Sequence, residues 1–246
     1  MQTFYFTDTG KVRSHNEDSV TIVNNDKKEF VLAIADGMGG HKAGEVASSI
    51  AIEHIINSFY KLETMGNKDD AIEWLRQIVK EINDKIFDYA KENPESKGLG
   101  TTLVIAIKTE DYILYGNIGD SSGYVIKNNT LHKVTRDHTL VNLLVSTGEL
   151  TEEEAKHHPR KNVLMRALGA NDPIEIDIFD VDTTVKGLFL CSDGLTNMLT
   201  DEQIEKILNS NLSIEEAVVR LIRKSNSRGG TDNISIAYLK KESGDL

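Results

Sequence analysis

Cysteine and proline are scarce in this 246-residue sequence, and long apolar runs are missing from it. The single cysteine, Cys191, excludes a disulfide within the chain and is typical of a protein from a reducing compartment. No apolar run approaches the ~20 residues that span a membrane, and no charged-then-apolar leader opens the sequence. With only three prolines and no Pro/Ser-rich linker, the sequence predicts one cytoplasmic domain over residues 1–246.

Positive charge is the other shortage. The sequence has 28 Lys and Arg against 39 Asp and Glu, which gives a formal net charge of −11. Phosphate backbones and anionic lipid surfaces need a basic face on the protein that binds them. We therefore expect neither a nucleic acid nor a membrane among the partners.

What the sequence does contain is a clear succession of strand and helix patterns. Apolar residues at three- and four-residue spacing predict helices over 43–62 and 71–86, and capping boxes start two more at Thr200 and Ser213. Runs rich in β-branched and aromatic residues predict strands. These are residues 3–8, 19–25, 30–36, 101–108, 112–119, 123–127, 130–134, 174–181, 187–192 and 233–241. Strands in runs, helices in pairs and hairpin-length connections indicate an α+β fold with antiparallel sheets.

Four aspartates share one setting, because each lies where an apolar strand meets a loop, beside a small or turn-forming residue. They are Asp36, Asp120, Asp193 and Asp232. Carboxylates crowded at strand ends repel one another, and a bound cation is the usual remedy. Oxygen ligands without Cys or several His suit Mg²⁺ or Mn²⁺ rather than Zn²⁺. An ordinary turn explains any one of these aspartates equally well, so the pattern alone leaves both interpretations open.

Two loops next to strands add candidate polar groups. Arg13, Glu17 and Asp18 lie between the first two expected strands, where one cation beside two acids is also compatible with a solvated hairpin turn. The loop after residues 30–36 is rich in glycine, but no Gly-Lys-Ser/Thr follows it, which excludes a P-loop.

Three other phosphatase or hydrolase signatures are incomplete. Residues 180–184 match the Asp-x-Asp-x-Thr motif of haloacid-dehalogenase phosphatases, but late in the chain and between antiparallel strands, which favours a hairpin turn. Gly119-Asp120-Ser121 lacks the later Asp-x-x-His of a serine esterase. Cys191 lacks the Arg six positions on that a cysteine phosphatase needs, since Asn197 is there.

Taken together, the motifs resemble those of the metal-dependent protein phosphatase 2C (PPM) family, especially its short bacterial stand-alone members. The matching blocks, in chain order, are Arg13–Asp18, Asp36–Gly40, Gly100–Thr102, Asn117–Ser121, Thr135–His138, His158-Pro159, Asn162-Val163, Arg166–Gly169, Ser192–Leu195 and Asp232-Asn233. Each block is weak alone, whereas their order and spacing are specific. The resemblance implies a sandwich of two antiparallel β-sheets flanked by pairs of α-helices, in four αββα layers.

The resemblance also gives the acids their roles. It implies that Asp36 bridges two Mn²⁺ or Mg²⁺ ions, that the Gly37 carbonyl holds one of them, and that Asp193 and Asp232 complete the second. A third ion is expected between Asp120 and Asp193. The residues expected to support the centre are Glu17, Asp18 and Asn233, while Arg13 is expected to bind the substrate phosphate. Two ions about 3.5–4 Å apart lower the pKa of a shared water, and the hydroxide attacks phosphorus directly.

Residues 138–165 resemble the family's flap, a segment beside the active site that shapes substrate choice. His157 and His158 are candidates for contacting a phosphorylated peptide, with a solvated basic turn as the alternative.

Two positions depart from the family. Met38 stands where animal members of the family carry a His that is proposed as the general acid. The general acid of this chain is therefore unassigned, and His41 or a metal-bound water are the candidates. Ser122 stands where an Arg is usual.

The predicted function is a serine/threonine protein phosphatase that opposes a bacterial Ser/Thr kinase and acts as a monomer on phosphorylated proteins. Two alternatives are a catalytically dead binding module of the same fold and a phosphatase of small phosphorylated metabolites. The complete set of acids, together with Arg13, counts against the dead module. The flap favours protein substrates, by analogy only.

Overall fold

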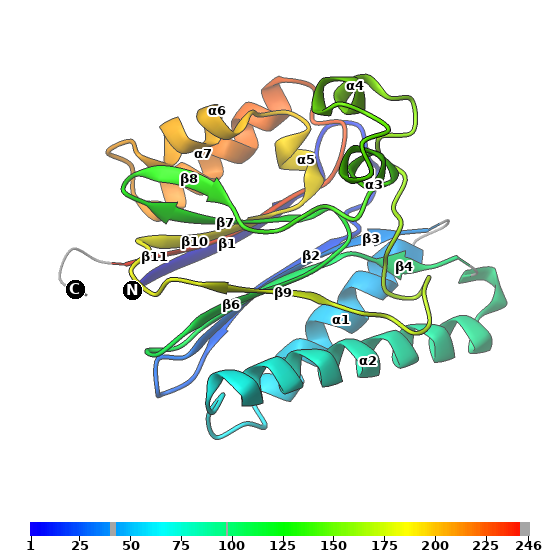
Figure 1. The fold of residues 1–246 in the computed structure, drawn as a ribbon, viewed down its shortest axis with the longest axis horizontal. Coiled ribbons are helices and arrows are strands. Elements are labelled where there is room, and N and C mark those ends of the chain that lie inside the picture. The colour runs from blue at the N-terminus through cyan, green and yellow to red at the C-terminus, as the bar shows by residue number, and fades with distance from the viewer. Residues whose placement is uncertain (40–42, 97, 242–246) are drawn as a thin grey trace.

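Two antiparallel sheets face each other, with a pair of helices against the outer side of each (Figure 1). The computed structural model describes residues 1–39, 43–96 and 98–241. The five-stranded sheet has the order β1 (Gln2–Asp8), β11 (Ile234–Lys240), β10 (Gly187–Cys191), β7 (Ser122–Lys127) and β8 (Thr130–Lys133). The six-stranded sheet has the order β2 (Asp18–Asn24), β3 (Phe30–Met38), β5 (Leu103–Lys108), β6 (Ile113–Ile118) and β9 (Asp177–Val181), with β4 (Gly100–Thr101) paired to the end of β3.

Each sheet is covered by its own helices. The long helices α1 (Ala43–Phe59) and α2 (Lys68–Glu92) lie on the six-stranded sheet, and α2 is followed by the 3₁₀ turn η1 (Pro94–Ser96). The helices α6 (Asp201–Leu208) and α7 (Ile214–Ser227), with the short α5 (Asp193–Thr196), lie on the five-stranded sheet. No helix in the described parts of the chain is long and apolar enough to cross a membrane. The predicted four-layer αββα sandwich is therefore confirmed.

The apolar pattern of β3 shows why the layers form. Successive strand residues point to opposite faces, so Val31 and Ala33 pack against α1 and α2 while Leu32 and Ile34 pack against the other sheet. All four side chains have no exposed surface. An uninterrupted apolar strand is what burial on both faces requires.

Local sequence signals start the helices as expected. Ser213 Oγ accepts a hydrogen bond from Glu216 N (3.1 Å), and Glu216 Oε2 accepts one from Ser213 N (2.8 Å), which completes a capping box at α7. A capping box also begins α6 at Thr200 with Gln203. Both predicted helix starts are confirmed.

The hairpin turn predicted for residues 180–184 is wrong, and so is the alternative of a hairpin turn at Arg13, Glu17 and Asp18. β1 and β2 lie in different sheets, as do β9 and β10. The loop 9–17 and the segment 182–186 are therefore crossovers between sheets. Strand and turn propensities act locally and do not distinguish a hairpin from a crossover of the same length.

Two strand boundaries also differ from the prediction. The run 101–108 is divided, since β4 ends at Thr101 and β5 begins at Leu103. Of residues 174–181 only Asp177–Val181 form a strand, and the ladder between β6 and β9 ends at the pair Asn117 and Asp177.

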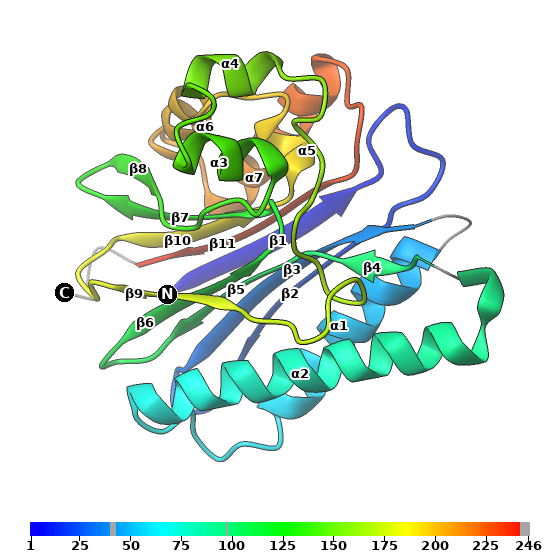
Figure 2. The same ribbon diagram turned by 45° about the vertical axis from the view of Figure 1, so that its right-hand side comes forward.

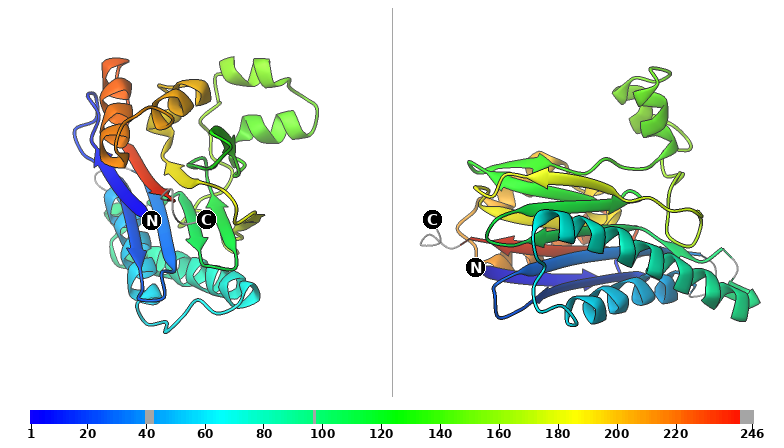
Figure 3. Two further views of the ribbon diagram at one scale, coloured as in Figure 1. Left: turned by 90° about the vertical axis from the view of Figure 1, so that its left-hand side faces the viewer. Right: turned by 60° about the horizontal axis from the view of Figure 1, so that its bottom comes forward.

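The segment 138–165 projects from the end of the sandwich opposite the start of β1 (Figures 1 and 3). It carries α3 (Leu140–Ser146) and α4 (Glu152–His157). Its two ends pair with each other: Leu140 N donates to Val163 O (2.8 Å), and Met165 N donates to His138 O (2.8 Å). The first and last residues of the segment therefore lie side by side, and the chain enters and leaves the sandwich at the same place.

Candidate active site

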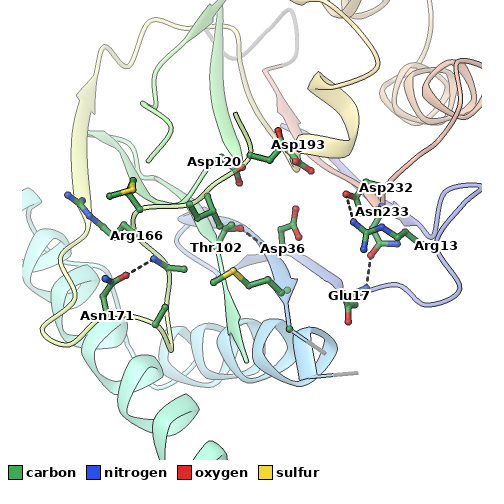
Figure 4. Close-up of a pocket in the computed structure, with 18 residues that line it drawn as sticks. Arg13, Glu17, Asp36, Thr102, Asp120, Arg166, Asn171, Asp193, Asp232 and Asn233 are labelled. Atoms are coloured by element: carbon green, nitrogen blue, oxygen red, sulfur yellow. Dashed lines mark hydrogen bonds and ion pairs between the residues drawn. The ribbon is translucent and has the colours of Figure 1, made fainter. Parts of the chain in front are cut away.

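The four strand-end aspartates meet at one end of the sandwich, in a cavity of about 490 Å³ (Figure 4). β3 and β6 run in the same direction because each pairs antiparallel with β5, so Asp36 and Asp120 emerge at the same edge. β10 and β11 are antiparallel, so the end of one strand, with Asp193, meets the start of the other, with Asp232. Each sheet therefore supplies two of the four carboxylates.

These carboxylates raise one another's pKa. Burial first, and then the charge of Asp193, raise the pKa of Asp120 to about 7. Burial and then the charge of Asp232 raise the pKa of Asp193 to about 6. Burial, followed by the charges of Asp18, Asp193 and Asp120, raises the pKa of Asp36 well above its usual value. Acids arranged in this way need a compensating positive charge near neutral pH.

The donor atoms fit a hard divalent cation. Oδ1 of Asp193 and Oδ1 of Asp18 are buried without a hydrogen-bond partner, and Figure 4 shows Asp36, Asp120, Asp193 and Asp232 around one open space. Among the described residues no three His, Cys, Asp or Glu side chains alone form a group able to hold an ion. Mg²⁺ does not need such a cage, since it keeps several waters and binds through one or two carboxylates.

Asp18 lies behind the cavity as the cross-strand partner of Asp36. Ser192 donates its hydroxyl to Asp18 Oδ2 over 2.8 Å. Burial raises the pKa of Asp18 to about 7, which the hydrogen bonds of Ser235 and Ser192 oppose. Glu17 lines the cavity, and burial likewise raises the pKa of its side chain, although Arg13 opposes that shift.

Arg13 reaches the cavity from the β1–β2 loop. Its Nη2 donates to Asp232 Oδ2 over 2.8 Å, while 49% of its side chain stays exposed. Asn233 fixes the loop that carries Arg13: its Nδ2 donates to Thr9 O and His15 O (both 2.9 Å), and its Oδ1 accepts from Glu17 N (2.8 Å). Asn233 therefore holds the start of β11 and the loop that carries Arg13 together.

Two glycines of the matching blocks allow backbones to pass at close range. A Cβ on Gly37 would lie 2.1 Å from Gly44 O, at the start of α1, and 2.6 Å from Glu17 O. A Cβ on Gly194 would lie 1.9 Å from Asn233 O. Real Cβ atoms do not approach so closely, so only glycine lets α1, α5 and the carboxylate-bearing strands meet here.

Thr101 and Thr102 hold the backbone of Asp36, a role that the sequence analysis missed. Thr102 Oγ1 accepts from Asp36 N (3.0 Å), and Asp36 O accepts from Thr102 N and from Thr101 Oγ1 (both 2.9 Å). Thr102 Oγ1 also lies 2.9 Å from Ser121 Oγ, next to Asp120. The adjacent Thr pair inside an apolar run was the available signal, because hydroxyls buried in a strand need partners.

His138, from another matching block without a predicted role, lies at the base of the 138–165 segment. Its Nδ1 accepts from Gly119 N (3.2 Å), and its Nε2 lies 3.1 Å from Asp177 Oδ2. Asp177 Oδ1 accepts from Arg166 Nη1 at 2.6 Å. Burial first, and then the charge of Arg166, lower the pKa of His138, although Asp177 raises it. The neutral ring with its proton on Nε2 satisfies the contacts with Gly119 and Asp177, while Arg166 Nη1 lies 3.4 Å from the same Nε2.

The 138–165 segment contributes one wall of the cavity. Asn162, Leu164 and Met165 line the cavity, and so do the nearby Arg166 and Asn171, which the sequence analysis did not single out as site residues. A second space of about 930 Å³ continues under α3 and α4, and both spaces are lined by Asp120, Asn162, Met165, Arg166 and Asp193.

Of the three candidate histidines, the structure describes His157 and His158, and neither reaches this wall. His157 lies 3.5 Å from Glu153 on the exposed side of α4, and His158 Nδ1 accepts from Arg160 N (3.1 Å). Neither lines either space. His41 lies outside the described residues.

The two departures from the family have different surroundings. Met38 lines the cavity and packs beside Gly100, where a Cβ would lie 2.9 Å from Met38 Cε. Ser122 is buried, and its hydroxyl has no hydrogen-bond partner.

Known proteins resemble this chain over its whole length. A family model described as protein phosphatase 2C matches residues 10–233. The serine/threonine phosphatase stp of Listeria welshimeri is 41% identical over 242 residues, which cover 98% of this chain and 96% of that protein. The structure of the Streptococcus agalactiae serine/threonine phosphatase has a TM-score of 0.92 at 33% identity, covering 98% of this chain and 99% of that one. Stp1 from Staphylococcus aureus has a TM-score of 0.91 at 37% identity, covering 98% and 95%.

Proposed function

The chain belongs to the protein phosphatase 2C family, and on that premise we propose that it hydrolyses phosphoserine and phosphothreonine in proteins. The observation that carries the proposal is the meeting of Asp36, Asp120, Asp193 and Asp232 with Arg13 in one cavity. The family as a whole depends on Mn²⁺ or Mg²⁺. The complete acid set argues against a dead binding module.

We assign the metal ligands as follows. The Asp36 carboxylate and the Gly37 carbonyl would hold one ion, Asp36 with Asp193 and Asp232 would hold a second, and Asp120 with Asp193 would hold a third. When bound, the ions supply hydroxide near neutral pH and neutralise phosphoryl oxygens. Glu17 lines this space and Asp18 adjoins it, so both carboxylates would accept hydrogen bonds from waters on the bound ions. Thr101 and Thr102 keep Asp36 oriented through its backbone.

Arg13 binds the substrate phosphate. Its Nη2 is committed to Asp232, which leaves the other guanidinium N–H groups for two phosphoryl oxygens. A guanidinium matches a phosphate with paired hydrogen bonds and stays charged at every working pH. Asp232 thus has two roles, as a metal ligand and as the group that aims Arg13.

The space beneath α3 and α4 favours protein substrates over small metabolites. A phosphate and its side chain occupy the 490 Å³ cavity, and the adjoining 930 Å³ leaves room for neighbouring residues of a polypeptide. We propose that residues 138–165 act as the flap over this room. His157 and His158, on its outer side, are candidates only for the distant flanks of a large substrate.

The wider setting of the reaction follows from this substrate class. We propose that the phosphoproteins are products of a bacterial Ser/Thr kinase and that the phosphatase acts on them as a monomer. A cytoplasmic location is proposed from the cysteine usage: the only thiol, Cys191, is free and buried.

The test compares hydrolysis of p-nitrophenyl phosphate and of a phosphothreonine peptide, with Mn²⁺ and with EDTA. We expect EDTA to abolish both activities and Asp193→Ala to lower kcat at least about a hundredfold. Asp180→Asn is the matched control, because Asp180 is exposed, pairs with Lys68 and belongs to the rejected haloacid-dehalogenase motif. Activity that survives EDTA, or an unaffected Asp193→Ala, contradicts the metal mechanism. If the enzyme hydrolyses p-nitrophenyl phosphate but not the phosphothreonine peptide, the result favours the small-metabolite alternative.

A further inference from the structure

Two segments of this acidic protein carry no acid at all. Residues 9–16 and 217–231 contain six Lys or Arg and no Asp or Glu, although 39 of the 246 residues of the chain are acidic. The six are Lys11, Arg13, Arg220, Arg223, Lys224 and Arg228, called the basic surface below. All are exposed except Lys224, which is half-buried.

The fold brings the two segments together. Lys11 N donates to Gly230 O over 2.8 Å, and Asn226 Nδ2 donates to Asp8 Oδ1 over 3.0 Å. Figures 1 and 2 show the end of α7, the loop after it and the β1–β2 loop side by side. The cations of both segments therefore belong to one region of the surface.

Helix geometry aligns the cations of α7 on the outside. Positions three and four apart are neighbours on a helix, so Arg220, Arg223 and Lys224 form one row. Arg223 also stands one turn before Asn226, whose side chain contacts Asp8 at the end of β1. The row runs toward the cavity, because α7 ends five residues before Asp232.

Few groups on the protein neutralise these charges. Lys11, Arg220, Arg223 and Lys224 form no ion pair within the described parts of the chain. Arg228 donates to Met198 O and Gln203 Oε1, which are neutral acceptors.

The nearby carboxylates are already engaged. Asp8 accepts from Gly10 N and Asn226 Nδ2, and Asp232 binds Arg13. Of the six cations of the basic surface, only Arg13 is therefore paired with a carboxylate in the described parts of the chain.

Helix stability alone does not account for this pattern. Cations near the C-terminus of a helix interact favourably with its dipole, but the effect is confined to the last turn. That explains Lys224 and not Arg220 or Lys11. A row of charge that continues from α7 to Arg13, at the proposed phosphate site, instead matches an extended anionic ligand.

We propose that the basic surface docks an acidic stretch of the phosphoprotein substrate while Arg13 holds the phosphate to be removed. The ligand class is a polypeptide with Asp, Glu or further phosphorylated residues near its phosphothreonine or phosphoserine. This inference rests on the proposed function and adds a substrate preference to it. Long-range attraction of this kind raises the encounter rate and lowers KM.

The test uses two phosphothreonine peptides that differ only in their flanks, one with Glu residues and one with Ser residues, and p-nitrophenyl phosphate. For the wild type at low salt we expect a KM about tenfold lower for the Glu peptide, as a few exposed charge pairs give. The triple variant Arg220→Gln/Arg223→Gln/Lys224→Gln removes most of this difference and leaves p-nitrophenyl phosphate turnover unchanged. Raising the salt to about 0.5 M does the same to the wild type, because the Debye length shrinks.

The matched control removes three exposed cations from α2, on the other helix layer: Arg76→Gln/Lys80→Gln/Lys85→Gln. The control should keep the preference for the Glu peptide. Equal KM values for both peptides on the wild type, or an equal loss in the α2 variant, overturn the docking surface. Absence of turnover of either peptide is a different result and overturns the proposed function itself.

Discussion

Gly119 donates its backbone N–H to Nδ1 of His138 over 3.2 Å, and His138 N returns a bond to Gly119 O at 2.8 Å. The turn before Asp120 is thus fastened to the base of the 138–165 segment. The same imidazole faces Asp177, which binds Arg166 on the cavity wall. One side chain joins a proposed metal ligand to the proposed flap.

The first prediction concerns this imidazole. His138→Leu leaves the Gly119 N–H and the Oδ2 atom of Asp177 without their partner, although Asp177 Oδ1 still binds Arg166. An unmade bond of this kind costs about 1–3 kcal/mol. We expect a lower melting temperature, weaker Mn²⁺ binding by calorimetry and a higher KM for phosphopeptide. His138→Asn should recover much of the loss because its Oδ1 can accept from Gly119, whereas equal behaviour of both variants would refute the argument.

The second prediction concerns Asn233, which bonds the β1–β2 loop at three points. Asn233→Asp keeps the acceptor for Glu17 N but places a carboxylate against the carbonyls of Thr9 and His15. We expect a loss of about 2–4 kcal/mol in the free energy of unfolding and an increased KM for p-nitrophenyl phosphate, because Arg13 moves with the loop. Urea denaturation and steady-state kinetics measure the two effects. Asn57→Asp, on the outer side of α1, is the control.

The third prediction is a pH dependence of stability far from the cavity. Burial opposes the shift, but hydrogen bonds from Met65 N, Asn25 Nδ2 and Thr64 Oγ1 lower the pKa of Glu29 from its usual 4.5. A carboxyl whose pKa is lower in the folded state stabilises the fold above its unfolded pKa, and that contribution is lost as pH falls through the folded pKa.

Glu29→Gln should therefore be less stable than the wild type by about 1–3 kcal/mol at pH 7, and the difference should shrink below about pH 4.5. Urea denaturation at a series of pH values measures it. Glu110→Gln, at an exposed turn, serves as reference. A difference that stays constant down to pH 3 would count against the assigned hydrogen bonds.

The fourth prediction concerns metal removal. The carboxylates of the cavity repel one another in the absence of cations, so Mn²⁺ binds the folded state preferentially. At a free concentration of 100 times Kd a single ion adds about 2.7 kcal/mol, which corresponds to roughly 5–10 °C in the melting temperature of a chain of this size. Scanning calorimetry with Mn²⁺ and with EDTA tests this, and Asp36→Asn should reduce the shift. No shift with Mn²⁺ would exclude a site of useful affinity.

The acids of the candidate site were predictable because each stands at the end of a strong apolar strand, where the sequence signal is local. The supporting groups were not. Thr102 forms a hydrogen bond with Asp36, which lies 66 residues earlier in the chain. His138 forms one with Gly119, although the two residues follow strands of different sheets. Neither contact produces a periodic pattern in the sequence. The crossover nature of loop 9–17 was missed for the same reason: which sheet a strand joins is decided by packing between layers.

The cavity draws one carboxylate pair from each sheet, Asp36 and Asp120 from one and Asp193 and Asp232 from the other. The proposed cation that Asp36 and Asp193 share would therefore cross-link the two halves of the sandwich. The distance between those halves is set by the apolar layer that contains Leu32 and Leu190. Removing a methyl group from this apolar layer would change the distance between the two carboxylate pairs, which the proposed ions must bridge. Such a mutation would therefore alter the reaction rate although the mutated side chain does not contact the active site.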